Sequence, residues 1–101
     1  MNPRFLNIIN SSKAVLVDFY AEWCIPCKDV TTVLKAVKKE MSQVKIVKVD
    51  VDKNPFIASH FKINRLPTLI FFKNGKLLWS GEGVYGVDEL KDILKDRLDE
   101  S

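Results

Sequence analysis

The segment Ala14–Ala21 is apolar, β-branched and aromatic throughout, apart from Asp18 in its middle. A strand with apolar side chains on both faces is buried only when both faces of its sheet are covered. The segment therefore predicts a central strand in a sheet that has helices packed on each side.

The rest of the chain alternates between helical and strand-like periods of apolar residues. In chain order the pattern predicts a short helix from Pro3 to about Ser12, a long amphipathic helix after the cysteines, a strand over Val44–Val51, a short helix begun by Asn54 and Pro55, strands over Thr68–Phe72 and Lys76–Trp79, and a last helix carrying Leu90, Ile93, Leu94 and Leu98. Strands that alternate with helices indicate parallel pairing through right-handed crossovers. The Asn74-Gly75 pair adds an antiparallel hairpin, so we expect an α/β fold with a mixed sheet.

The chain has 101 residues, enough for one domain over residues 1–101 and no second core. The formal net charge is +3, and the lysines are interleaved with acidic residues. Without a basic run or a stacking motif, we expect no nucleic-acid partner. No apolar run approaches the roughly 20 residues that span a bilayer, and Met1–Asn10 lacks the apolar core of a signal peptide. We therefore expect a cytoplasmic protein without membrane contact.

The two cysteines, Cys24 and Cys27, are separated by only two residues. A disulfide that closes so short a loop removes little entropy from the unfolded chain, so the pair would stabilise the fold poorly. In the cytosol such a pair indicates redox chemistry or metal binding. A structural zinc needs about four ligands, and His60 is the only histidine of the chain. We expect no metal, with a site shared between two chains as the remaining alternative.

The redox interpretation gives the two thiols different roles. Cys24 stands where the central strand ends and a helix begins, and the free N–H groups and dipole of a helix start favour a thiolate. Cys27 follows one turn later, close enough to attack a mixed disulfide and release the substrate as a dithiol. Pro26 costs little in a first turn, because its missing N–H would have no intrahelical partner.

Asp18 interrupts a strand that should otherwise be buried. A buried carboxylate without partners is costly and tends to take up a proton, which raises its pKa. The functional interpretation is an acid placed under the dithiol that deprotonates Cys27 through water. Lys48 on the adjacent predicted strand could be its charge partner. The alternative is that Asp18 faces a partly wet edge and is only tolerated.

Pro67 and Trp23 are further candidates. Pro67 stands just before an apolar strand, where proline would cost a hydrogen bond of the sheet. It is either an ordinary loop proline or a cis-proline that presents a free backbone edge to a substrate. Trp23 belongs either to the core or to the rim of a substrate groove beside Cys24.

Several segments of the chain resemble the thioredoxin family in order and spacing, and the resemblance covers about Ala14 to Leu98. The matching segments are Asp18–Lys28, Val49–Pro55, Leu66–Thr68, Phe72–Lys76 and Gly83. Together these motifs are highly specific, and the chain is identified from them as a member of that family.

The resemblance implies a thioredoxin fold and a monomeric protein-disulfide reductase, an electron carrier of cell redox homeostasis. Such a protein needs no cofactor of its own, acts on disulfide-containing proteins and is recharged by thioredoxin reductase. The resemblance also implies that Cys24 is the nucleophile, Cys27 the resolving thiol, Asp18 the buried acid, Lys48 its neighbour and Pro67 a cis-proline. The resemblance implies that Trp23, Leu66, Pro67 and Gly83 line the substrate groove. With the neighbouring residues of this chain added, the predicted substrate-binding residues are Trp23, Ile25, Pro26, Arg65, Leu66, Pro67 and Gly83.

Four features depart from the family pattern. Ile25 stands where glycine is usual, which leaves the redox potential open, and Thr32 replaces a proline that kinks the long helix, so we expect a straighter helix. Arg65 stands where a small residue is common. Its charge would either favour acidic substrates or simply face solvent. The stretch before Ala14 is short, so we expect the first edge strand to be missing and about four strands to remain.

Two other function classes compete with a reductase. Dithiol oxidants and isomerases of this kind often carry a histidine between the cysteines to stabilise the thiolate, which Ile25 cannot do. A non-catalytic binding module would use the fold as a scaffold only, and the intact set of Cys24, Cys27, Asp18 and Pro67 argues against it.

Overall fold

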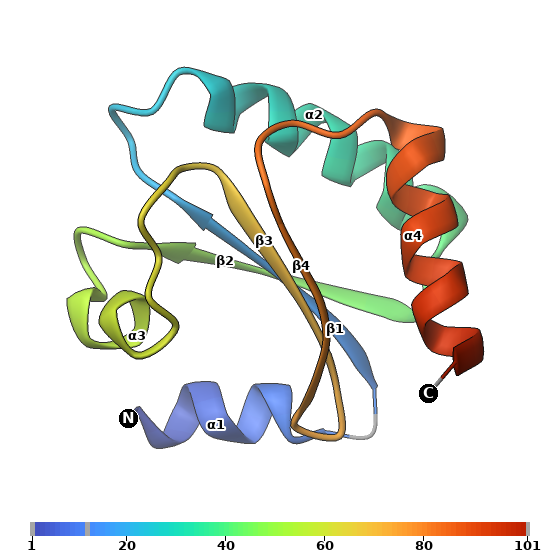
Figure 1. Cartoon of the computed structure of the whole chain (residues 1–101), viewed down its shortest axis with the longest axis horizontal. Coiled ribbons are helices and arrows are strands. Elements are labelled where there is room, and N and C mark those ends of the chain that lie inside the picture. The colour runs from blue at the N-terminus through green and yellow to red at the C-terminus, as the bar shows by residue number, and fades with distance from the viewer. Residues whose placement is uncertain (1, 12, 101) are drawn as a thin grey trace.

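The computed structural model describes residues 2–11 and 13–100 and contains the helices and strands in the predicted order (Figure 1). Their bounds are α1 Pro3–Ile9, β1 Ala14–Tyr20, α2 Pro26–Glu40, β2 Val44–Asp50, α3 Pro55–His60, β3 Thr68–Lys73, β4 Lys76–Glu82 and α4 Val87–Glu100. The strands of the described residues form one open sheet in the order β2-β1-β3-β4. The expected fold class, a mixed four-stranded sheet flanked by helices, is confirmed.

The strand β1 lies inside the sheet, as its apolar sequence predicts. It pairs in parallel with β2 and antiparallel with β3, and β3 continues through the hairpin into β4. Every residue of Ala14–Phe19 is buried. At the hairpin turn, Asn74 and Gly75 both have positive φ, 53° and 77°, which is the backbone that an Asn-Gly hairpin turn uses.

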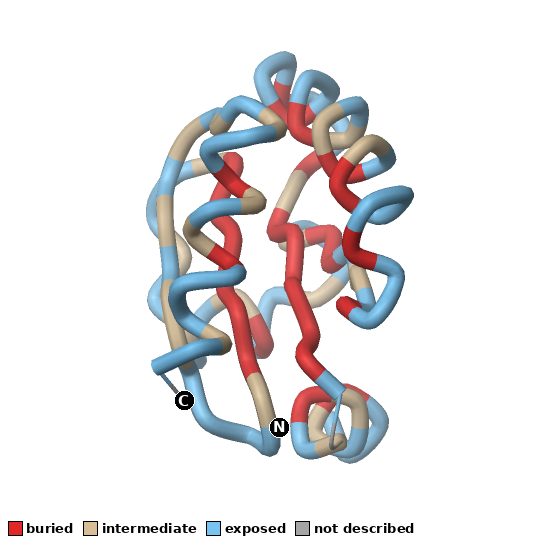
Figure 2. The backbone as a smooth tube through the Cα atoms, turned by 90° about the vertical axis from the view of Figure 1, so that its right-hand side faces the viewer, coloured by how far each residue is buried: buried red, intermediate tan, exposed pale blue. Residues whose placement is uncertain are grey.

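Each face of the sheet has its own apolar core, because alternate residues of a strand point to opposite faces. Leu16 and Phe71 lie in the core under α2 and α4, whereas Val17 and Phe72 lie in the core under α1 and α3. Figure 2 shows the buried residues along the strands and the inner sides of the helices. Lys91 Nζ donates to Glu40 Oε1 over 2.7 Å and links α4 to α2 at the surface.

The first helix is shorter than predicted. It ends at Ile9, and Ser12, where its expected end falls, lies outside the described residues. Asn2 caps its start, since Asn2 Oδ1 accepts from Arg4 N over 2.8 Å. The hairpin meets its other end, where Gly75 N donates to Ile9 O over 2.8 Å.

The third helix begins at Pro55 after Asn54, as predicted, but the side chain of Asn54 does not cap it. Instead, Asn54 Nδ2 donates to Asp50 O over 3.0 Å. With φ −130° and ψ 59°, Asn54 closes the turn after β2, and its amide is used there. Predicted strand ends differ from the observed ones by a few residues: β1 and β2 stop one residue early, while β3 and β4 extend to Lys73 and Glu82.

Candidate active site

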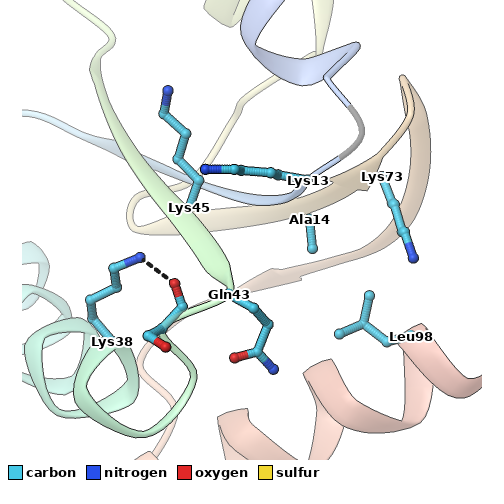
Figure 3. Close-up of a pocket in the computed structure, with 8 residues that line it drawn as sticks. Lys13, Ala14, Lys38, Gln43, Lys45, Lys73 and Leu98 are labelled. Atoms are coloured by element: carbon cyan, nitrogen blue, oxygen red, sulfur yellow. Dashed lines mark hydrogen bonds between the residues drawn. The ribbon is translucent and has the colours of Figure 1, made fainter.

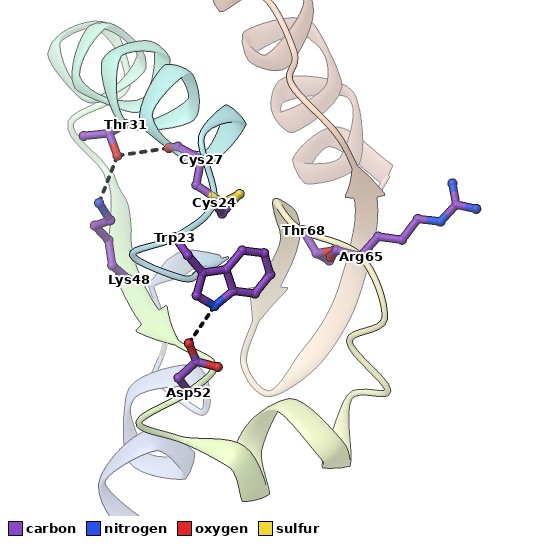
Figure 4. Close-up of a disulfide and its surroundings, with 8 residues drawn as sticks. All are labelled: Trp23, Cys24, Cys27, Thr31, Lys48, Asp52, Arg65 and Thr68. Atoms are coloured by element: carbon purple, nitrogen blue, oxygen red, sulfur yellow. Dashed lines mark hydrogen bonds between the residues drawn. A yellow bond between two sulfur atoms is a disulfide. The ribbon is translucent and has the colours of Figure 1, made fainter.

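Cys24 and Cys27 are joined by a disulfide at the start of α2, with their Cα atoms 5.4 Å apart (Figure 4). The loop after β1 places them there, because Cys24 N donates to Ala21 O over 3.1 Å and turns the chain into the helix. Ile25 occupies the N-cap position and Pro26 is the first helical residue. Pro26 thus stands where proline is tolerated.

Both cysteines are buried in the disulfide form. They form a small cluster with Ala21, against which Tyr20, Val51 and Leu66 pack. The side chains of their sequence neighbours are exposed instead: Trp23 is 70% and Ile25 is 77% exposed. Two exposed apolar side chains therefore flank the disulfide, which suits contact with another protein chain.

Asp18 is fully buried in the middle of β1, so the alternative of a wet strand edge is wrong. Neither of its carboxylate oxygens has a hydrogen-bond partner. Burial raises the pKa of Asp18 to about 6, and the nearby positive charge of Lys48 partly lowers it again. A carboxylic acid with a pKa in this range can take up and release protons near neutral pH.

Lys48 stands in register with Asp18 on the neighbouring strand β2. Its ammonium group donates to Thr31 Oγ1 over 2.9 Å and lies 4.6 Å from the centre of the Tyr20 ring. Thr31 Oγ1 in turn donates to Cys27 O over 3.3 Å. Lys48 thus acts on Asp18 through its charge, and its hydrogen bond connects it to the backbone of the second cysteine (Figure 4).

Thr31 was missed by the sequence reasoning. The signal was present, because Thr31 follows Cys27 by four residues, and residues with that spacing share a helix face. Its partner on β2 could not be read from the spacing.

The Leu66–Pro67 peptide bond is cis, as predicted. Pro67 is buried, and its carbonyl oxygen accepts from Gly83 N over 2.9 Å. Gly83 has φ +94°, a conformation that glycine adopts readily and other residues do not. The structure therefore brings together Leu66, Pro67 and Gly83, three of the predicted substrate-binding residues.

Arg65 is exposed at the beginning of the same loop, and its carbonyl oxygen accepts from Thr68 Oγ1 over 2.6 Å. Figure 4 shows its guanidinium group extending away from the disulfide. This orientation favours the alternative in which Arg65 faces solvent, and a role in substrate choice stays a prediction.

Trp23 is held at the surface by a hydrogen bond, because its indole Nε1 donates to Asp52 Oδ2 over 2.8 Å. The structure thus places Trp23 at the rim and not in the core. Asp52 lies in the turn after β2, and sequence reasoning did not single it out. Its backbone N donates to Asp50 Oδ1 over 2.9 Å, which fixes the turn that presents it.

A metal centre finds no support in the described residues, where no group of three or more His, Cys, Asp or Glu side chains is placed to hold an ion. His60 packs its ring edge-on against Phe61, with the ring centres 4.9 Å apart. Within residues 2–11 and 13–100, no helix has the length and apolar character to cross a bilayer.

Comparisons with known proteins agree with this geometry. The thioredoxin family model matches residues 2–96. A thioredoxin of Buchnera aphidicola is 44% identical over 88 residues, with 86% of this chain and 81% of the relative covered. A thioredoxin of Chlamydia trachomatis is 45% identical over 84 residues, with 83% and 82% covered.

Solved structures show the same similarity. Oxidised mitochondrial thioredoxin 3 from Saccharomyces cerevisiae matches with a TM-score of 0.84 and 33% identity, covering 92% of this chain and 87% of that one. Thioredoxin from Trypanosoma brucei brucei matches with a TM-score of 0.86 and 31% identity, covering 98% of this chain and 87% of that one.

Proposed function

Since this chain belongs to the thioredoxin family of thiol–disulfide oxidoreductases, we propose that Cys24 attacks the disulfide of a substrate protein and that Cys27 resolves the product. The chain acts by dithiol–disulfide exchange. The observation that carries the division of roles is the position of the disulfide at the start of α2, above a sheet that holds a buried, unpartnered acid.

The exchange starts from the reduced form. The Cys24 thiolate attacks one sulfur of the substrate disulfide, a new S–S bond forms, and the other substrate sulfur leaves as a thiolate that takes up a proton. Cys27 then loses its proton and attacks the Cys24 sulfur. The mixed disulfide breaks, the second substrate sulfur leaves and is protonated, and Cys24 and Cys27 end as the observed disulfide. Two electrons and two protons pass to the substrate.

The start of α2 supports Cys24 as the attacking group. Cys24 stands just before a helix of 15 residues, whose first turn presents free N–H groups and the positive end of the helix dipole. Both stabilise a thiolate relative to a thiol, and only the thiolate attacks disulfides.

Asp18 is proposed to move the proton of Cys27, through water. Its pKa of about 6 lets it accept a proton at neutral pH and give it back after resolution. Lys48, tied to Thr31 and through it to the Cys27 carbonyl, is proposed to keep a positive charge near this proton path.

The substrate is proposed to bind across the exposed rim of the disulfide. Trp23, Ile25 and Pro26 form one side, and the Pro67 loop with Gly83 forms the other. The proposed binding residues are Trp23, Ile25, Pro26, Arg65, Leu66, Pro67 and Gly83. The exposed apolar side chains at the rim would be covered by substrate, which contributes to binding.

The wider role follows the family. We propose that thioredoxin reductase returns the Cys24–Cys27 disulfide to the dithiol, and that the protein works as a monomeric single domain in the cytoplasm, carrying electrons in redox homeostasis. Its bacterial relatives support this assignment. Sedimentation of the purified chain tests the monomer, and cell fractionation tests the compartment.

Insulin reduction with dithiothreitol as electron donor tests the reductase. We expect rapid turbidity with the native chain, none with Cys24→Ser, and a trapped mixed disulfide with Cys27→Ser. A chain without turnover would be a binding module instead. If alkylation of the reduced protein labelled Cys27 faster than Cys24, the roles would have to be exchanged.

A further inference from the structure

A groove of about 450 Å³ runs between α2 and β2, on the same side of the sheet as the Lys48–Thr31 hydrogen bond. Its floor is apolar and consists of Leu34 and Ile46. Its rim carries four lysines, Lys35, Lys38, Lys39 and Lys48, and none of the described residues that line it is acidic or aromatic. Lysines that are interleaved with acids along the sequence are thus gathered by the fold into one basic rim.

The groove borders the open edge of the sheet. Within the described part of the chain β2 pairs only with β1. Val51 N donates to Tyr20 O, so the peptide groups of odd-numbered residues of β2 face β1. Since peptide groups alternate along a strand, those of Ile46 and Lys48 face outward.

The two ends of this edge are already engaged. Val44 O accepts from Lys38 Nζ over 2.6 Å, and Asp50 O accepts from Asn54 N over 2.9 Å. Lys38 Nζ also donates to Ser42 O, and Figure 3 shows this bond beside the start of β2. The middle of the edge, around Ile46 and Lys48, is left to accept an added strand.

We infer that the groove and the open edge of β2 together bind an extended acidic segment of a partner protein. Such a segment would add to the sheet through the outward peptide groups of Ile46 and Lys48. One apolar side chain would cover Leu34 and Ile46, and carboxylates on alternate positions would face the lysines of the rim.

The lysines of the rim and of β2 favour an acidic peptide over the other possible occupants. Lysines on an edge strand repel a second copy of the same edge and so discourage self-association. A nucleic acid would find phosphate contacts but no aromatic side chain for its bases and no use for the peptide groups of β2. An acidic peptide can pair its carboxylates with the lysines, cover the apolar floor and form hydrogen bonds with the strand edge at the same time.

A fluorescein-labelled peptide Ser-Glu-Ser-Val-Ser-Glu-Ser, capped at both ends, tests the inference, because its valine and both glutamates fall on one face of a strand. We expect saturable binding by anisotropy that weakens as salt rises, with NMR shift changes at the amides of Ile46 and Lys48. Lys35→Glu/Lys39→Glu should weaken binding about tenfold or more, since close charge pairs are replaced by repulsion. Lys76→Glu/Lys95→Glu is the charge-matched control and should bind like the native chain.

Three further probes complete the design. The same peptide with lysine in place of both glutamates should not bind, and the peptide with proline in place of the serine after its valine should bind more weakly because it loses a strand N–H. Equal binding of the Lys35→Glu/Lys39→Glu variant, or equal binding of a short single-stranded DNA at the same amides, would overturn the inference. Insulin reduction by this variant should stay at the native rate, so the outcome does not depend on the redox assignment.

Discussion

Lys48 Nζ donates to Thr31 Oγ1 over 2.9 Å although Lys48 stands in register with the unpartnered Asp18. The hydroxyl of an α2 residue therefore binds the ammonium group that could otherwise turn toward the buried acid. Thr31 contributes no proton of its own to the exchange. Thr31 positions the charge of Lys48, so its effect can be measured as a change in the pKa of Asp18, separately from any change in stability.

The first prediction concerns this hydroxyl. Thr31→Val keeps the side-chain shape and frees Lys48, which should approach Asp18 and lower its pKa below about 6, because an opposite charge favours the ionised form. NMR titration of the Asp18 carboxyl measures the shift. Thr31→Ser keeps the hydroxyl and should restore the native value. An unchanged pKa in Thr31→Val would show that Lys48 is held by other contacts.

The second prediction concerns the stability cost of Asp18. Its pKa is raised from 3.8 to about 6, so between these values the folded chain binds more protons than the unfolded chain, and stability falls as pH rises. Below pH 3.8 the cost is absent, and above about pH 6 it is complete. Asp18→Asn should therefore stabilise the fold at pH 8 by about 2 to 3 kcal/mol and slow turnover.

Urea unfolding at pH 8 and at pH 4 measures the effect of Asp18→Asn. The gain should shrink at the lower pH. Asp96→Asn removes an exposed carboxyl of α4 and serves as the control, with little change expected at either pH. A clear destabilisation by Asp18→Asn at pH 8 would mean that the acid has a strong partner when ionised.

The third prediction concerns the indole of Trp23. Asp52→Ala removes its acceptor, so the ring should become mobile and the KM for a protein disulfide should rise, while reduction of a small disulfide dye stays unchanged. Asp52→Asn removes the charge but keeps an acceptor oxygen, which separates the hydrogen bond from electrostatics. If Asp52→Asn raises the KM for insulin as much as Asp52→Ala does, the lost charge and not the ring position causes the rise.

The fourth prediction concerns Ile25, whose exposed side chain is proposed to be covered by substrate. Ile25→Ser should raise the KM for peptide disulfides with apolar flanks by about five- to thirtyfold, because burying such a side chain contributes about 1 to 2 kcal/mol. Phe56→Ser is the matched control, since Phe56 is 86% exposed on α3 and outside the proposed rim. Equal effects of both substitutions would argue against a specific role of Ile25.

The fifth prediction separates backbone strain from crowding at Gly83. A Cβ atom at Gly83 or at Gly86 would meet no atom within 4 Å, but only Gly83 has a positive φ, +94°. Gly83→Ala should cost about 1 to 2 kcal/mol of unfolding free energy, whereas Gly86→Ala, directly before α4, should cost only the loss of a favourable N-cap residue, about 0.5 kcal/mol. Thermal unfolding of both variants makes the comparison. A neutral Gly83→Ala would mean that the loop relaxes to negative φ.

The fold could be predicted from the sequence because apolar burial controls it. The run around Val15 and Val17 is buried on both faces, and only a central strand provides that. The stripe through Val30, Leu34 and Val37 likewise predicts the buried face of α2. The ends of the helices were harder to predict. For example, α1 ends at Ile9, whose carbonyl oxygen accepts a hydrogen bond from the hairpin residue Gly75.

The polar contacts of the site could not be predicted in the same way. Thr31, Asp52 and Asn54 each bind a group on another element or turn. A single hydrogen bond contributes about 1 kcal/mol and leaves no periodic pattern, so its partner is known only once the elements have packed. Asp18, in contrast, could be identified from the sequence because it interrupts an apolar pattern.

The contact of the hairpin with α1 has a consequence for the order of folding during synthesis. A helix of seven residues is too short to persist alone in water, and its end receives hydrogen bonds from Asn74 N to Ser11 O and from Gly75 N to Ile9 O. The helix α1 therefore waits for a turn that is synthesised much later than the helix itself. Until residues 74 and 75 are synthesised, the nascent chain exposes Phe5 and Ile9, which the finished protein buries, and a chaperone could bind these side chains during that interval.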